Sequence, residues 1–164
     1  MAKIAEARNS HPKAARTQED ARALKQAIEA FSSEYGRLPR IDSSDNEVRT
    51  NSAAGIDLLT ILLAEENGSD AMQNPKKIPF ASFKKVKSKK WGGLAYSDPR
   101  PGARPQGLYD VWGHPLRVII RPPDATELVF TYGGKAVVLK DTVVAVVSAG
   151  PDGEEGNKDD IRTW

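Results

Sequence analysis

KAARTQEDARALKQAIEAFSSEYG, residues 13–36, is the segment that decides the fold. Its mostly apolar positions recur at alternating steps of four and three, which is the spacing of one face of an α-helix. These positions are Thr17, Ala21, Leu24, Ile28, Phe31 and Tyr35. Gly36 is placed to end the helix in the left-handed conformation, and Pro39 prevents its continuation. Because the stripe covers only about a third of the circumference, we expect a helix over 13–35 that lies on another layer.

A second helix is predicted over residues 53–66. Its apolar positions, 56, 59, 62 and 63, again have helical spacing, and Asn67–Gly68 is a suitable end. The polar segment 41–52 before it is interpreted as a loop. Residues 74–79 contain two prolines, which exclude regular strand pairing there.

The last third of the chain predicts a small sheet. Short β-branched runs occupy residues 116–121, 127–132, 135–140 and 142–148. Gly133–Gly134 between two of these runs is typical of a hairpin turn, because glycine tolerates positive φ. Helices followed by an antiparallel meander indicate an α+β fold. We expect the long N-terminal helix to pack across the sheet formed by residues 116–148.

Composition limits the classes of function. The chain has 164 residues, the size of one domain covering 1–164. It contains no cysteine, which excludes disulfides, thiol catalysis and cysteine-based metal sites. His11 and His114 stand far apart and give little support to a zinc site or a Ser–His–Asp triad. The net charge of +2 does not call for nucleic acid, and no apolar run reaches the roughly 18–20 residues that span a membrane.

The tail, SAGPDGEEGNKDDIRTW at 148–164, carries the most chemistry. Five acidic residues and one lysine lie between Asp152 and Asp160, and such carboxylates repel one another unless they are solvated or share a cation. Oxygen ligands without nitrogen or sulfur select calcium or magnesium. Glycines at 153 and 156 let the loop fold back so that main-chain carbonyls can join, although the EF-hand pattern is not met. The residues alone leave two interpretations, a metal loop and a solvated acidic turn.

Three motifs, in order along the chain, resemble one family. The tail resembles the C-terminal calcium loop of the major pseudopilins of type II secretion systems and of their type IV pilin-like relatives. That loop opens with Ser-x-Gly-x-Asp-Gly and ends with Asp-Ile-x-x-Trp, as residues 148–153 and 160–164 do here. The family motif Tyr/Leu-x-Asp-Pro-Trp-Gly-x-Pro is similar to residues 108–115, where Val111 replaces the first proline. The helix exit EYGRLP, 34–39, resembles the family's Glu/Asp-x-Gly-x-Tyr/Leu-Pro.

This resemblance implies a pilin-like fold with calcium in its C-terminal loop. Carried over residue by residue, the ligands are the side chains of Asp152 and of Asp159 or Asp160. Backbone carbonyls near Ala149 and Asn157 complete the shell. Asp160 fits the Asp-Ile motif and Asp159 fits a tighter loop, so both stay open. The alternative for Asp159 is an ordinary surface carboxylate.

The resemblance also implies a function without enzymatic activity. The chain would be a structural subunit of a type II secretion pseudopilus or a type IV pilus-like filament. Its partners would be further copies of itself, other pseudopilins and the inner-membrane assembly platform of a bacterial envelope, with this domain periplasmic or in a surface filament. The family's leader and apolar half-helix do not occur in the sequence. We therefore expect a truncated, monomeric ectodomain with residues 1–12 frayed.

Two alternatives compete with this interpretation. One is a soluble extracytoplasmic module that binds calcium or a polyanion and forms no filament. The other is a hydrolase that uses Asp110, His114 and a tail aspartate, although their spacing supports no nucleophile–base pair. In the main interpretation Asp110 caps the turn before Trp112, His114 is a turn residue, and Trp112 and Trp164 anchor the core and the loop.

The segment from Lys76 to Lys90 has seven lysines and no acidic residue. Such a run is usually a solvated face. It is also suited to polyanions or acidic lipid headgroups, and in a filament it would meet the acidic tail of a neighbouring subunit.

Overall fold

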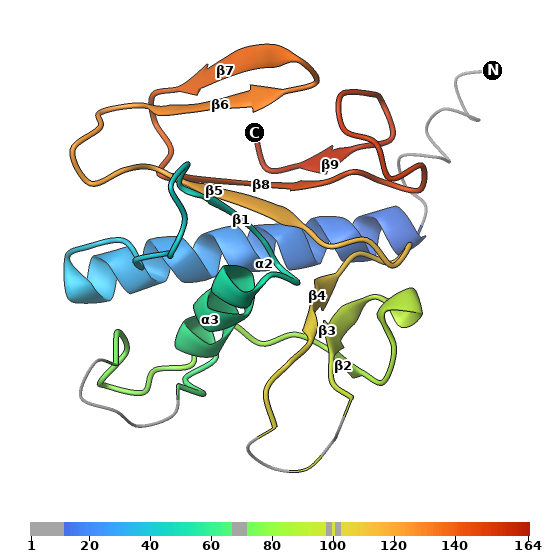
Figure 1. Cartoon of the computed structure of the whole chain (residues 1–164), viewed down its shortest axis with the longest axis horizontal. Helices are drawn as coiled ribbons and strands as arrows, with labels where there is room; N and C mark the ends of the chain where they lie inside the picture. The colour runs from blue at the N-terminus through green and yellow to red at the C-terminus, as the bar shows by residue number, and fades with distance from the viewer. Residues whose placement is uncertain (1–11, 67–71, 98–99, 101–102) are drawn as a thin grey trace.

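A computed structural model describes residues 12–66, 72–97, 100 and 103–164. Its longest element, α2 (Pro12–Tyr35), runs the length of the molecule (Figure 1). Five of the six predicted stripe positions, 17, 21, 24, 28 and 31, are buried together with Ala27, whereas Tyr35 is half-buried. Gly36 ends the helix at φ +69°, and its N–H donates to the Ser32 carbonyl at 2.8 Å. The prediction of a helix over 13–35 is confirmed.

The expected frayed segment needs one correction. The expected segment, 1–12, includes Pro12, whereas the structure places Pro12 as the first residue of α2. Proline suits the first helical position, because the N–H that it lacks would have no partner there. The rest of the segment, residues 1–11, lies outside the described part of the chain.

The helix packs on a four-stranded antiparallel sheet in the order β1-β5-β8-β9. The strands are β1 (Glu47–Arg49), β5 (Arg117–Ile120), β8 (Val144–Ser148) and β9 (Ile161–Arg162). Strands β8 and β9 contact α2 directly (Figure 1). The α+β class, with a long N-terminal helix on an antiparallel sheet, is therefore confirmed. The polar segment 41–52 is not all loop, because it contains β1.

A separate hairpin, β6 (Leu128–Tyr132) and β7 (Lys135–Leu139), lies on the other face of this sheet. Gly133 and Gly134 form its turn at φ +57° and +78°, as the sequence predicts. The four expected strands are present, but the simple meander is wrong, because β5 pairs with β8 rather than with β6.

Alternation along the strands explains the two layers. Val118 and Val146 belong to the core that contains α2. Their neighbours Ile119 and Ala145 face the opposite way and pack with Leu128 of the hairpin. The central strands are therefore buried on both faces, which accounts for their continuous apolar runs.

The second helix, α3 (Ala53–Leu62), is shorter than the predicted 53–66. Ser52 caps its start by accepting a hydrogen bond from the Gly55 N–H at 3.1 Å. At its end Ala64 adopts a left-handed φ of +60°, and the Glu65 N–H returns to the Thr60 carbonyl at 2.8 Å. The helix thus ends before Asn67–Gly68, the predicted stop, which lies outside the described residues.

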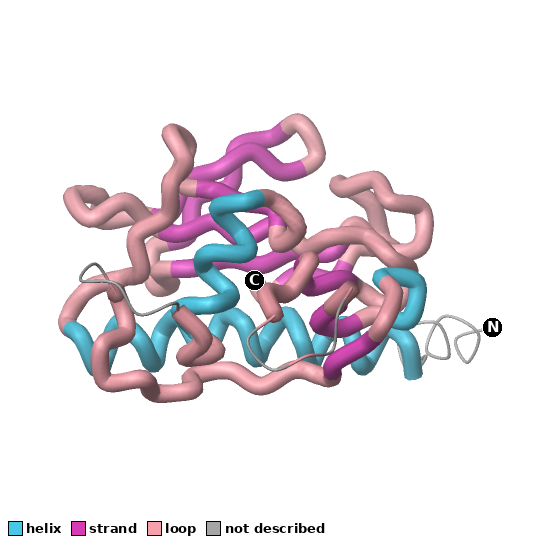
Figure 2. Tube along the Cα trace, turned by 60° about the horizontal axis from the view of Figure 1, so that its bottom comes forward, coloured by secondary structure: helices cyan, strands magenta, loops and turns pink. Residues whose placement is uncertain are grey.

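The region between α3 and β5 contains a second small sheet, β2-β3-β4. Its elements are β2 (Lys85–Val86), the 3₁₀ turn η1 (Lys89–Trp91), β3 (Gly93–Ala95) and β4 (Gly107–Tyr109). It lies near the N-terminal half of α2, on the side away from β8 and β9 (Figures 1 and 2). The structure thereby divides the lysine run. Lys76 bonds Glu34 near the end of α2, while the lysines from 84 onward lie along β2 and η1.

Candidate functional site in the C-terminal loop

The tail forms a loop between β8 and β9, over residues 149–160. Gly150 closes its base at φ +72°, where a Cβ atom would lie 2.2 Å from the Asp159 carbonyl oxygen. Gly153 and Gly156 also have positive φ values, +72° and +100°. The glycines therefore let the two ends of the loop approach more closely than side chains would allow.

The predicted ligands occupy different places in this loop. Asp152 is exposed, and its carboxylate accepts from the Glu154 N–H at 3.0 Å and from the Asn157 side-chain amide at 2.5 Å. Asp159 is exposed, and its N–H donates to the Asn157 side chain at 2.9 Å. Ala149 is buried. Asn157 thus holds Asp152 and Asp159 together through its side chain.

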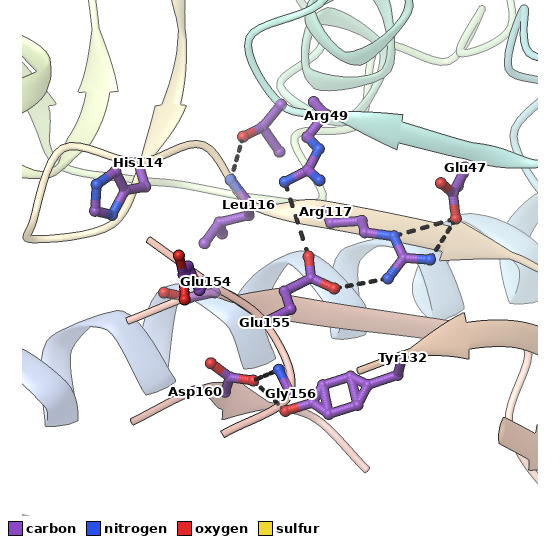
Figure 3. Close-up of polar contacts among 12 residues, drawn as sticks. Glu47, Arg49, His114, Leu116, Arg117, Tyr132, Glu154, Glu155, Gly156 and Asp160 are labelled. Atoms are coloured by element: carbon purple, nitrogen blue, oxygen red, sulfur yellow. Dashed lines mark hydrogen bonds and ion pairs between the residues drawn. The ribbon is translucent and has the colours of Figure 1, made fainter. Parts of the chain in front are cut away.

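Asp160 lies beside Tyr132 and Gly156 (Figure 3). Its Oδ2 accepts from the Tyr132 hydroxyl, from the Gly156 N–H at 2.6 Å and from the Asn157 N–H at 3.3 Å. Its Oδ1 is buried and has no hydrogen-bond partner in the described part of the chain. A buried carboxylate oxygen without a partner is costly unless something else neutralises it.

This donor set suits a hard cation only if main-chain oxygens contribute. Across the described residues, no three Asp, Glu, His or Cys side chains converge on one point. Two carboxylate oxygens of the loop, Asp160 Oδ1 and Glu155 Oε2, are buried without a hydrogen-bond partner among the described residues, and Glu155 Oε2 lies 3.8 Å from Arg49 Nη1. These properties fit calcium, which accepts mixed carboxylate and carbonyl ligands in flexible geometry.

The loop is anchored at its base by the turn that follows β4. Asp110 Oδ1 accepts from the N–H groups of Trp112 and His114 at 3.0 and 2.9 Å, so the predicted turn cap is confirmed. Asp110 Oδ2 accepts from the Ser148 hydroxyl at 2.7 Å, and His114 Nδ1 lies 3.0 Å from the Gly150 carbonyl oxygen. Two of the three sequence motifs, 108–115 and 148–153, therefore meet in one hydrogen-bonded node.

Burial raises the pKa of the Asp110 carboxyl above its ordinary value, although its hydrogen bonds to Ser148, His114 and Trp112 act in the opposite direction. The Ser148 hydroxyl is completely buried and donates to Asp110 rather than to His114. His114 Nδ1 lies 3.9 Å from Asp110 Oδ2. The node therefore has the geometry of a structural anchor and does not align Ser148 with a base.

A second anchor, which sequence reasoning missed, is Arg117 on β5 (Figure 3). Arg117 is 8% exposed and donates to Glu47 at 2.7 and 3.1 Å, to Glu155 at 2.8 Å and to the Thr131 carbonyl at 2.8 Å. Burial lowers the pKa of Arg117, but the carboxylates of Glu47 and Glu155 outweigh it, so the pKa is raised. The signal in the sequence was a lone arginine within the apolar run 116–120.

Aromatic side chains fix the far end of the loop. Trp164 packs edge-on against Phe130 and Tyr132, with ring centroids 5.0 and 5.1 Å away. The predicted role of Trp164 as a loop anchor is confirmed. Burial, followed by the Asp160 carboxylate, raises the pKa of Tyr132 to about 12. Trp112 is half-buried beside the Asp110 turn.

Comparisons of the chain with protein-family models, with curated proteins and with solved structures found no match. Among the helices within the described residues, none combines the length and the apolar character needed to cross a membrane.

Proposed function

We propose that the chain is the extracytoplasmic domain of a filament subunit similar to type II secretion pseudopilins and type IV pilin-like proteins. The observation that carries the proposal is the node in which the 108–115 and 148–153 motifs meet. Its bonds, Ser148 to Asp110 and His114 to Gly150, join positions 38 and 36 residues apart. If the two motifs resembled the family only by chance, there would be no reason for them to lie together and bond each other in the fold.

The long helix supports the same proposal. Only one face of α2 is buried, and Arg22, Gln26 and Glu29 on the remaining circumference are exposed. In the proposed filament this exposed face turns toward the filament axis, and the β6–β7 hairpin faces outward. The proposed function is mechanical. Each subunit contributes a long helix and a β-sheet, and the C-terminal loop holds the two together.

Calcium is the proposed cofactor of that loop. Asp152 and Asp160, with main-chain carbonyls near Ala149 and Asn157, would hold it. Asp160 is favoured over Asp159 because its Oδ1 is buried and unsatisfied, whereas Asp159 is exposed. The cation would neutralise clustered carboxylates and fix the loop against β9.

Cysteine cross-linking tests the filament, because the chain contains no cysteine of its own. The intact gene product, expressed in its host, carries Gln26→Cys on the exposed face of α2. A bismaleimide linker should then give a ladder of multimers on a denaturing gel. The matched control is Lys140→Cys, another exposed residue, beyond β7, which should give no ladder.

The proposal also requires an apolar segment of about 20 residues encoded upstream of residue 1 in the gene. Gln26→Cys protein that stays monomeric in the host, together with upstream codons lacking that segment, would overturn it. That outcome would favour the competing interpretation, a soluble module that binds calcium or polyanions.

A further inference from the structure

The lysine-rich segment carries a set of exposed charged side chains that lie outside the C-terminal loop. This Lys–Trp surface consists of Lys84, Lys85, Lys87, Lys89, Lys90 and Trp91. All six are exposed, and within the described residues none of the five lysines has a carboxylate at ion-pair distance. Lys76, from the same sequence run, instead bonds Glu34 at 2.6 Å. The five lysines along 84–90 therefore form a run of positive charge that has no ion-pair partner in the described part of the chain.

Trp91 is displayed on a fixed turn. Its side chain is 63% exposed, the highest value among the exposed large hydrophobic residues described. The backbone beneath it is tightly held, because the Gly92 carbonyl accepts from Arg16 Nη2 at 2.7 Å. A Cβ atom on Gly92 would also lie 2.7 Å from the Val111 Cα. The fold thus fixes the main chain and leaves the indole largely exposed, with Lys90 Nζ 5.5 Å from its ring centroid.

We propose that the Lys–Trp surface docks on an anionic phospholipid bilayer. Lysine side chains near an anionic leaflet gain electrostatic attraction, and indole is the side chain whose apolar body and N–H group suit the headgroup boundary. Turn η1 lies near the N-terminal end of α2 in both views (Figures 1 and 2). The proposal does not depend on filament assembly.

A lipid surface fits better than a nucleic acid. Single-stranded nucleic acids are bound in basic grooves with several aromatic rings for base stacking. Here Trp91 is the one exposed aromatic of the segment, and Tyr96 is half-buried with Lys85 Nζ 5.3 Å from its ring centroid. The turn at Gly113–His114 stands between η1 and the acidic C-terminal loop: a Cβ atom on Gly113 would lie 3.6 Å from the Lys89 carbonyl oxygen, and one on Gly153 would lie 3.2 Å from His114 Nε2.

Vesicle co-sedimentation of residues 1–164 tests the proposal. Vesicles of 30% phosphatidylglycerol in phosphatidylcholine should bind the chain, and pure phosphatidylcholine should not. Lys87→Gln/Lys89→Gln/Lys90→Gln should weaken binding about a hundredfold, because each lysine near such a surface contributes roughly fivefold. The matched control, Lys77→Gln/Lys135→Gln/Lys140→Gln, removes three exposed lysines elsewhere and should keep binding within about threefold of the unmodified chain if docking is local.

Tryptophan fluorescence tests the aromatic contribution. Anionic vesicles should shift the emission to the blue, and Trp91→Phe should bind while losing that shift. Thermal midpoints of all variants should match the unmodified chain, since the substituted residues are exposed. Equal weakening by both triple variants would overturn the proposal. So would binding to heparin or a single-stranded oligonucleotide without binding to anionic vesicles.

Discussion

Replacing Asp110 should weaken the attachment of the C-terminal loop to the rest of the fold and lower the stability of the protein. The side chain is fully buried and accepts three hydrogen bonds, from the N–H groups of Trp112 and His114 and from the Ser148 hydroxyl. Asp110→Ala leaves all three donors without their acceptor, at a cost of about 1–1.5 kcal/mol each. We therefore expect the free energy of unfolding to fall by about 3–4.5 kcal/mol. For a chain of this size each kcal/mol moves the thermal midpoint by about 2–4 °C.

Asp110→Asn is the discriminating variant. It keeps Oδ1 as the acceptor for the two N–H groups and loses only the carboxylate oxygen that faces Ser148. The expected cost is about 1 kcal/mol, since one hydrogen bond is changed and no cavity forms. Urea unfolding at pH 7, with calorimetry as a check, measures both variants. Similar losses from the two variants would show that the buried hydrogen bonds do not anchor the loop.

The pH dependence has a defined sign. Burial raises the pKa of folded Asp110 above its ordinary value of 3.8, so the folded chain holds the proton more tightly than the unfolded chain. The stability that this provides is complete below pH 3.8 and is lost as the pH rises through the folded pKa. The difference in unfolding free energy between the unmodified chain and Asp110→Asn should therefore decrease as the pH rises from 3.8 through the folded pKa. A difference in unfolding free energy that grows with pH would refute a buried Asp110 carboxyl with a raised pKa.

Three other results are expected. Calcium at a hundredfold excess over its Kd should stabilise metal-stripped protein by about 2.7 kcal/mol, which raises the thermal midpoint by several degrees. Asp152→Ala should abolish this response. Equal melting curves in calcium and in chelator would exclude the site. In spectrophotometric titration Tyr132 should ionise near 12, and Asp160→Asn should lower its pKa toward 10, since the carboxylate is one cause of the shift. Gly150→Ala should destabilise the loop, because the new Cβ meets the Asp159 carbonyl oxygen at 2.2 Å and φ is +72°; an unchanged midpoint would contradict the loop closure.

Local patterns in the sequence were enough for the long helix and the hairpin turn. The α2 stripe and the positive φ values at Gly133–Gly134 follow from spacing and residue type alone. The pairing of β5 with β8 was missed, because it depends on which face of each strand the hairpin covers. Strand β1 was missed for a similar reason. Its three residues form a strand through their register with 117–119, about 70 positions away.

The candidate site shows the same division between local and long-range information. Its acidic residues, glycines and oxygen-donor chemistry can be read within the last 17 residues. The residues that anchor the loop cannot be identified from that segment, because Tyr132, His114 and Arg117 contact it from other elements. Arg117 offered only the hint of one charge in an apolar run, since its partners Glu47 and Glu155 lie 70 residues before it and 38 after it. Contacts from three other parts of the chain therefore position the loop without a cation. Calcium, if it binds, would add to the stability that these contacts provide.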